Sequence, residues 1–219
     1  MAAIADALQI SHFAVSGWSG GGPHALACAA VLTDRVTCVA TASSIAPYGV
    51  TGLNWLQGMG EGNIAELRSA LAGRDPLSRF VEKQLRLAMS PSPEISPELR
   101  SMLSPVDRQV LSGALGPYLE SGTKEGTALG PAGWVDDDLA FVAPWGFELS
   151  AIRAPVSIWH GKQDLFVPFA HGIWLASKAP ESEFRSFDGE GHLSLYERRT
   201  PEVFDWLLAN GRNPGYDLD

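Results

Sequence analysis

The sequence predicts an α/β fold, a mostly parallel sheet flanked by helices and interrupted by an inserted helical segment. Two observations carry this prediction. Helix and strand patterns alternate at both ends of the chain, which is typical of parallel β-α-β layers. Between them, residues 47–147 show few strand patterns and repeated helix starts. The 219 residues suffice for one domain with a large core.

The first 46 residues are expected to begin with a helix and then alternate strand and helix. Ile4, Ala7 and Leu8 share one helical face, and the short apolar runs beyond them are typical of buried strands. The expected elements are a helix over Ala2–Ile10, a strand over Phe13–Ser16, a glycine-rich turn over Gly17–Pro23, a helix over Ala25–Leu32 and a strand over Val36–Ala42.

The middle of the chain is expected to hold four or five short helices. Asn63 with Glu66 three residues later resembles a capping box, and three capping residues stand directly before proline. These three pairs are Asp75-Pro76, Ser96-Pro97 and Ser104-Pro105. We therefore predict a helical insertion over residues 47–147 and a core formed by residues 1–46 and 148–219.

The α/β pattern returns after the insertion. Apolar runs and helical periodicity alternate again, and Pro201 is expected to start the last helix. The expected elements are strands over Val156–Trp159 and Glu183–Phe187, and helices over Pro168–Lys178 and Pro201–Leu208.

Composition and charge restrict the possible partners and location. The net charge of −9 argues against nucleic acid and anionic membranes as partners. The first ten residues lack the basic region of a signal peptide, and no apolar run is long enough to span a membrane. Cys28 and Cys38 lie in apolar surroundings without metal-ligand spacing, so we expect two buried, reduced thiols. A cytoplasmic protein is expected.

The pentapeptide Gly17-Trp18-Ser19-Gly20-Gly21 fits the pattern G-x-S-x-G. A strand is expected before it and a helix after it, which is the context of a nucleophile elbow. Such a turn strains the backbone of the serine, so small neighbours are needed two residues to either side, at Gly17 and Gly21. Ser19 is the candidate nucleophile, and the N–H of Gly20 the candidate oxyanion donor.

A serine nucleophile needs a base, and His192 is the favoured histidine. It lies in Gly189-Glu190-Gly191-His192-Leu193, a glycine-flanked loop after the last expected strand. His24 is one turn into a helix, where it would face away from Ser19, so a structural or pocket-rim role is favoured. Three further histidines are interpreted as structural: His12 and His160 at strand ends, and His171 on a surface helix.

The histidine in turn needs an acid, and Asp164 is the favoured carboxylate. It follows the expected strand Val156–Trp159, and 28 residues separate it from His192, enough for one helix and one strand. Asp188 is the rival, but its closeness to His192 favours an outward turn role.

These motifs together resemble the α/β-hydrolase fold family, in its serine-hydrolase branch with a cap domain. The resemblance rests on GWSGG at residues 17–21, HGKQDLFVP at 160–168, GEGHLSL at 189–195 and the order serine, aspartate, histidine. It implies that the helical insertion is the cap. It also implies hydrolysis of esters or related acyl compounds through an acyl-enzyme, without cofactor or metal.

The sequence departs from the family's pattern before Ser19. By resemblance, the first four strands, one helix and the loop with the second oxyanion donor are absent. Phe13–Ser16 would then be an exposed sheet edge. It could be covered by a second copy in a homodimer or by a segment on a separate chain, or the sequence could be truncated. The competing hypothesis is a non-catalytic or impaired protein that serves as a binding or interaction module.

Aromatic side chains around the expected insertion predict an apolar pocket for a small acyl substrate. Each aromatic residue taken singly is more typical of packing than of ligand contact. The candidate pocket residues are Trp18, Trp55, Met59, Trp134, Trp145 and Phe166.

Overall fold

Four parallel strands form the sheet of this protein, in the order β1-β2-β3-β4. The computed structural model describes residues 1–88 and 96–211. Val39 of β2 lies at the centre of the sheet, paired with Val15 of β1 and Val156 of β3. The strands are β1 (Phe13–Trp18), β2 (Val36–Ala42), β3 (Val156–Gly161) and β4 (Glu183–Phe187). All four predicted strands are confirmed, although β1 and β3 are each two residues longer than expected.

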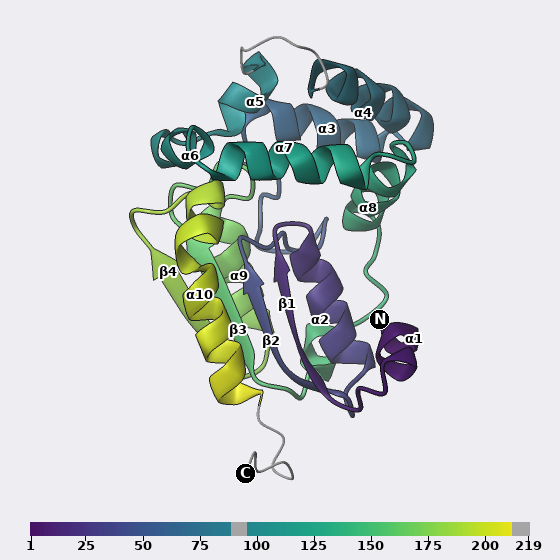
Figure 1. Ribbon diagram of the computed structural model, residues 1–219, viewed down its shortest axis with the longest axis vertical. Coiled ribbons are helices and arrows are strands. Elements are labelled where there is room, and N and C mark those ends of the chain that lie inside the picture. Colours follow the sequence, from purple (N-terminus) through teal and green to yellow (C-terminus); the bar gives the residue numbers. More distant parts are fainter. Residues whose placement is uncertain (89–95, 212–219) are drawn as a thin grey trace.

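Helices cover both faces of the sheet (Figure 1). On one face, α2 (Gly21–Val31) and α9 (Phe169–Lys178) bury Leu26 and Leu175 against Val39 and Ile158. On the other face, α10 (His192–Asn210) packs against Trp159. A short helix α1 (Ala2–Ala7) precedes β1, and a 3₁₀ turn η1 (Leu149–Ala151) precedes β3. The parallel α/β fold expected from the alternating patterns is confirmed.

A layer of helices lies over the carboxyl ends of the strands (Figure 1). We call α3 to α8 the helical layer; they follow β2 and precede β3 in the chain. These helices are α3 (Glu61–Leu71), α4 (Arg74–Ala88), α5 (Pro97–Met102), α6 (Pro105–Leu111), α7 (Leu115–Gly126) and α8 (Ala132–Val142). Between residues 47 and 147, the described residues thus form six helices, more than the four or five expected.

Two of the predicted helix starts in this layer are confirmed in atomic detail. The Ser96 side chain accepts a hydrogen bond from the N–H of Leu99, and Ser104 does the same for Asp107. The capping role of Asn63 is wrong, because α3 begins two residues earlier, after Gly60. The Asn63 side chain instead donates to the Phe166 carbonyl oxygen, 2.8 Å away.

The boundaries of two helices beside the sheet also differ from expectation. Helix α2 begins at Gly21, so the tight turn is confined to Ser19 and Gly20. Helix α10 begins at His192, nine residues before the expected start, and Pro201 lies inside it. Proline is disfavoured there because it lacks an N–H donor, but Val203 and Trp206 beyond it remain buried against the sheet. Packing of the apolar face therefore outweighs the local preference.

Other expectations concern the thiols and the membrane. Both cysteines are free, as expected, but only Cys38 is buried and Cys28 is half-buried. Within residues 1–88 and 96–211, no helix combines the length and apolarity that a membrane crossing requires.

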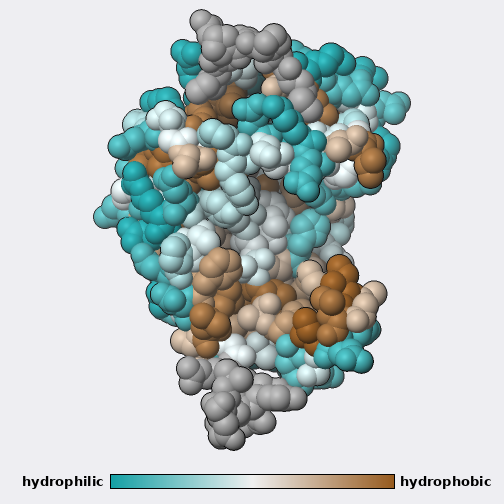
Figure 2. Space-filling model, viewed as in Figure 1, coloured by the Kyte–Doolittle hydropathy of each residue, from teal (hydrophilic) through white to brown (hydrophobic). Residues whose placement is uncertain are grey.

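Strand β1 lies at one edge of the sheet, so only β2 pairs with it. Ala14 and Ser16 in this strand are exposed, whereas Val15 is buried. Apolar surface gathers on both sides of the strand, over α1 and over α10 (Figure 2).

Candidate active site

Ser19 occupies the sharp turn between β1 and α2. Its φ of +56° lies in the left-handed region, which a non-glycine residue adopts at a cost. Two backbone hydrogen bonds hold this conformation: the Ser19 N–H donates to the Ala42 carbonyl, and the Ser19 carbonyl accepts from the Gly22 N–H. The turn thus presents the Ser19 side chain at the carboxyl end of the sheet.

Glycines in and beside the turn allow neighbouring groups to approach closely. A β-carbon on Gly17 would collide with the backbone of Gly21, so the expected need for a small residue at 17 is confirmed. The same expectation for Gly21 is wrong, because a β-carbon there would meet open space. Gly22 is crowded as well, since a β-carbon there would collide with the Ser44 side chain.

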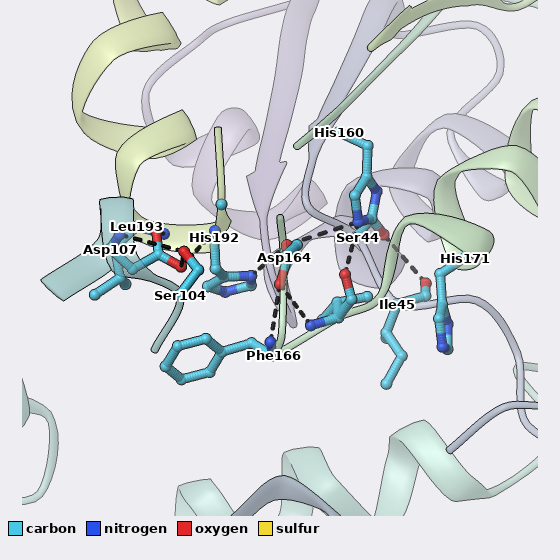
Figure 3. Close-up of polar contacts among 12 residues, drawn as sticks. Ser44, Ile45, Ser104, Asp107, His160, Asp164, Phe166, His171, His192 and Leu193 are labelled. Atoms are coloured by element: carbon cyan, nitrogen blue, oxygen red, sulfur yellow. Dashed lines mark hydrogen bonds and ion pairs between the residues drawn. The ribbon is translucent and has the colours of Figure 1, made fainter. Parts of the chain in front are cut away.

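His192 and Asp164 come together at the same end of the sheet. The His192 Nδ1 lies 2.8 Å from the Asp164 Oδ2, and both side chains are at least 97% buried (Figure 3). Because the carboxylate is an acceptor, Nδ1 carries the proton and Nε2 is left as the basic nitrogen. His192 is the first residue of α10, so the loop position expected for it is wrong.

Several groups stabilise the ionised form of Asp164. Its Oδ1 accepts from the backbone N–H groups of Phe166 and Val167, at 2.9 and 2.8 Å. Burial alone would raise the pKa of this carboxyl, but His192, the second histidine His160 and the Val167 N–H together hold it below its ordinary value. Asp164 is therefore a carboxylate at neutral pH.

His160 lies on the far side of Asp164 from His192 (Figure 3). Its Nε2 donates to the Val167 carbonyl at 2.7 Å and lies 3.6 Å from the Asp164 Oδ2. Burial lowers the pKa of His160, so the ring is neutral. A structural role was predicted for His160, but not its closeness to Asp164. The turn after β3 brings these two side chains together.

His171 is buried, so its expected place on a helix surface is wrong. It lies on α9 as predicted, but its ring faces the core, where Nδ1 accepts from the Ala46 N–H and Nε2 donates to the Trp55 carbonyl. Burial lowers its pKa to about 4. The three remaining acid and histidine candidates are at the surface: Asp188 pairs with Lys162, His24 pairs with Asp137, and His12 is exposed.

Aromatic rings enclose His192. Phe166 stacks on it, with centroids 4.6 Å apart and planes 23° from parallel, and Trp18 lies 5.0 Å away. Within the described residues, no hydrogen bond joins the Ser19 hydroxyl to His192, and the N–H of Gly20 has no partner. Both groups are therefore left available at the turn.

The six predicted pocket residues divide into three groups. Trp18 and Phe166 touch His192. Trp55 and Met59 are buried with Ile45 and Val167 in a cluster that Phe166 also contacts. Trp134 and Trp145 do not join this cluster: Trp134 packs among α3, α4 and α8, and Trp145 stacks on Phe147 against the sheet core.

The fold and the turn agree with a known family. A family model of the alpha/beta hydrolase fold matches residues 1–199. The chain belongs to the α/β-hydrolase fold family. Solved α/β-hydrolase structures superpose on it with low sequence identity. One from Chitinophaga pinensis gives a TM-score of 0.60 at 18% identity, covering 95% of this chain and 69% of that one. A bromoperoxidase from Bacillus anthracis gives 0.59 at 21%, covering 94% and 69%.

Two curated relatives carry hydrolase names. A 2-hydroxy-6-oxononadienedioate/2-hydroxy-6-oxononatrienedioate hydrolase from Paraburkholderia phymatum is 27% identical, covering 94% of this chain. A pimeloyl-[acyl-carrier protein] methyl ester esterase from Aromatoleum aromaticum is 38% identical over 48 residues, which are 22% of this chain. The chain spans 64% of the first relative's length, and the second alignment spans 19% of its relative. The family and these relatives support a hydrolase.

Proposed function

We propose that this α/β hydrolase is a serine hydrolase that cleaves esters or related acyl compounds through an acyl-enzyme. The observation that carries the proposal is the buried hydrogen bond between the His192 Nδ1 and Asp164, at the same sheet end as the strained turn of Ser19. A general base, its orienting acid and a nucleophile on a sharp turn are the parts that acyl transfer needs.

The chemistry follows from the protonation of His192. Because Asp164 holds the Nδ1 proton, Nε2 accepts the Ser19 proton as the hydroxyl attacks the carbonyl carbon. The Gly20 N–H donates to the oxyanion that forms. His192 then protonates the leaving alcohol, and water cleaves the acyl-enzyme by the same steps. This sequence uses no cofactor or metal.

The surroundings of His192 favour an apolar acyl group. Trp18, Phe166 and Leu193 share one apolar cluster with Leu103 of the helical layer. We propose that the helical layer acts as the cap over this site. The methyl ester esterase among the relatives is consistent with an ester substrate. The free thiols and the acidic surface fit a cytoplasmic enzyme.

A fluorophosphonate probe tests the proposal, because it reacts only with an activated serine. We expect labelling of the wild type, none of Ser19→Ala, and normal labelling of Ser16→Ala, an exposed serine on β1. Asp164→Asn should lower kcat for a p-nitrophenyl ester by about 10⁴, because the wrong tautomer is favoured. A folded wild type that resists the probe would instead support the competing hypothesis, a non-catalytic binding module.

The dependence of activity on the length of the acyl chain tests whether the substrate is apolar. We expect kcat/KM to rise from p-nitrophenyl acetate to the butyrate, since a longer acyl chain buries more apolar surface against the cluster around His192. A monoester of a dicarboxylic acid, which carries a charge, serves as the comparison. Preference for the charged ester would overturn the apolar assignment.

A further inference from the structure

The first turn of α10 is capped by a residue from the helical layer. Helices leave their first N–H groups without partners inside the helix, and a side chain usually accepts from them. The residue before α10 is Gly191, which has no side chain to do this. Its own N–H donates to the Ser194 hydroxyl, 2.8 Å away.

Asp107 of α6 accepts the free N–H groups instead. Its Oδ2 lies 3.1 Å from the His192 nitrogen, and its Oδ1 lies 2.9 and 3.0 Å from the nitrogens of Leu193 and Ser194. The Ser104 hydroxyl donates to the Oδ2 at 2.8 Å. The Asp107 side chain is fully buried, and its negative charge lies at the positive end of the α10 dipole.

The contact requires α6 to approach the start of α10 closely, and Gly191 makes this possible. A β-carbon on Gly191 would collide with the Asp107 carboxylate and would lie 2.5 Å from the Ser104 Oγ. Glycine at this position therefore lets α6 reach the helix end. Asp107 and His192 are 85 residues apart in the chain, so the contact joins the helical layer to the sheet domain.

His192 is thus held from two sides (Figure 3). Asp107 accepts from its backbone N–H, and Asp164 accepts from its ring. We propose that Asp107 is a positioning residue for the hydrolase reaction, which fixes the backbone of the catalytic base so that its ring keeps the hydrogen bond to Asp164 and leaves Nε2 to accept the Ser19 proton. This inference rests on the proposed function. It assigns to the helical layer a part in the chemistry besides covering the substrate.

The test compares Asp107→Ala with Asp107→Asn. Alanine removes all acceptors, whereas asparagine keeps one oxygen that can serve Leu193 and Ser194 but presents an N–H group to His192. A displacement of about 1 Å at a catalytic group can cost about 100-fold in rate. We expect fluorophosphonate labelling and kcat to fall about 100-fold in Asp107→Ala, with KM within about threefold, and to fall less in Asp107→Asn.

Two control variants separate positioning from stability and charge. Val81→Ala opens a cavity in the helical layer, at a fully buried side chain among α3, α4 and α8. Glu190→Gln removes a buried carboxylate next to Gly191 that pairs with Arg198 and Arg199. Both should label at the wild-type rate. Equal slowing in either control, or a folded Asp107→Ala labelled at the wild-type rate, would overturn the inference.

An NMR measurement tests the positioning without substrate. The His192 Nδ1 proton, held by Asp164, should give a low-field resonance in the wild type that broadens or disappears in Asp107→Ala and persists in Val81→Ala. If the wild type resists the probe but shows this behaviour, the proposed function fails, while the finding that Asp107 positions the His192 ring stands. An unchanged resonance in Asp107→Ala overturns the positioning alone.

Discussion

The ring of Phe141 lies directly against the backbone of Gly20. A β-carbon on Gly20 would be 2.5 Å from the Phe141 Cζ, and Phe141 belongs to α8 of the helical layer. A side chain from that layer therefore contacts the residue whose N–H is the proposed oxyanion donor. The Gly20 backbone itself, with φ −59° and ψ −18°, suits any residue.

Gly20→Ala should consequently lose activity through Phe141 alone. The added methyl group would displace the ring or the turn, and a displaced donor costs about 10²-fold in kcat. Phe141→Ala in the same chain should restore most of this loss, as measured by kcat in a double-mutant cycle with a p-nitrophenyl ester. Additive effects of the two substitutions would contradict this explanation.

Asp138→Asn should stabilise the protein at neutral and alkaline pH. Burial and the nearby Glu66 carboxyl raise the pKa of Asp138 from 3.8 to about 9. Between these values the unfolded chain is ionised here while the folded chain keeps its proton, so the free energy of unfolding falls as pH rises from about 4 to about 9. Asparagine stays neutral and removes this dependence.

Urea unfolding at pH 5, 7 and 9 measures the effect. Asp136→Asn is the matched control, because Asp136 lies on the same helix but is exposed and paired with Arg74. The wild type and the control should lose stability across the series, and Asp138→Asn should lose less. Parallel curves for all three proteins would show that Asp138 is ionised in the folded state.

His171 should cause a loss of stability on the acid side. Burial lowers its pKa from 6.5 to about 4. The stability that the neutral His171 gives the folded chain is therefore fully present above pH 6.5. As pH falls from 6.5 to 4, the unfolded chain takes up a proton and the folded chain does not. His171→Gln, whose amide can serve both Ala46 and Trp55, should flatten this part of the curve.

The exposed His24 supplies the control for that experiment. Thermal melting of His24→Gln between pH 4 and 7 should follow the wild type. A residual slope is expected in His171→Gln, because burial also lowers the pKa of His160. An unchanged slope in His171→Gln would assign the whole acid transition to other groups.

We propose that the open edge of β1 pairs with a second copy of the chain. The strand offers unpaired backbone groups, and the apolar side chains of Ile4, Leu8 and Val31 are exposed near it. Light scattering after size exclusion should give the mass of a dimer. Ala14→Lys places a charge on this exposed strand and should give a monomer with unchanged circular dichroism. A monomeric wild type at about 100 µM, well above a micromolar Kd, would exclude this pairing.

The sequence was sufficient to predict the sheet but not all helix ends. The apolar run Val36–Ala42 predicts β2 with its observed bounds, as expected of a strand buried on both faces. Strand β3 extends two residues past its apolar run, to the polar His160 and to Gly161. The predicted start of α10 at Pro201 is wrong, since the local preference of proline is for the first turn of a helix. Contacts from distant residues, above all Asp107, determine where that helix begins.

The candidate site shows the same division. Ser19, Asp164 and His192 each stand in a short motif, so they could be singled out from the sequence. Asp107 and Phe141 stand in no such motif, and His160 begins the motif of Asp164 but was assigned no role toward that acid. Their proximity to His192, Gly20 and Asp164 arises only when the turn after β3 and the helical layer fold against the strand ends. The Ser104-Pro105 pair predicts the start of α6 but not that this helix contacts the first turn of α10.

The carboxylate of Asp107 on the first turn of α10 limits how freely the helical layer of this protein can be exchanged. The covering helices of an α/β hydrolase are an obvious target for exchange when a new substrate range is wanted. Here a transplanted set of helices would have to bring its own acceptor to the His192 end of α10, or retain residues 104–107 from this chain. Chimeras designed without that short segment would start with an uncapped helix beneath the new pocket.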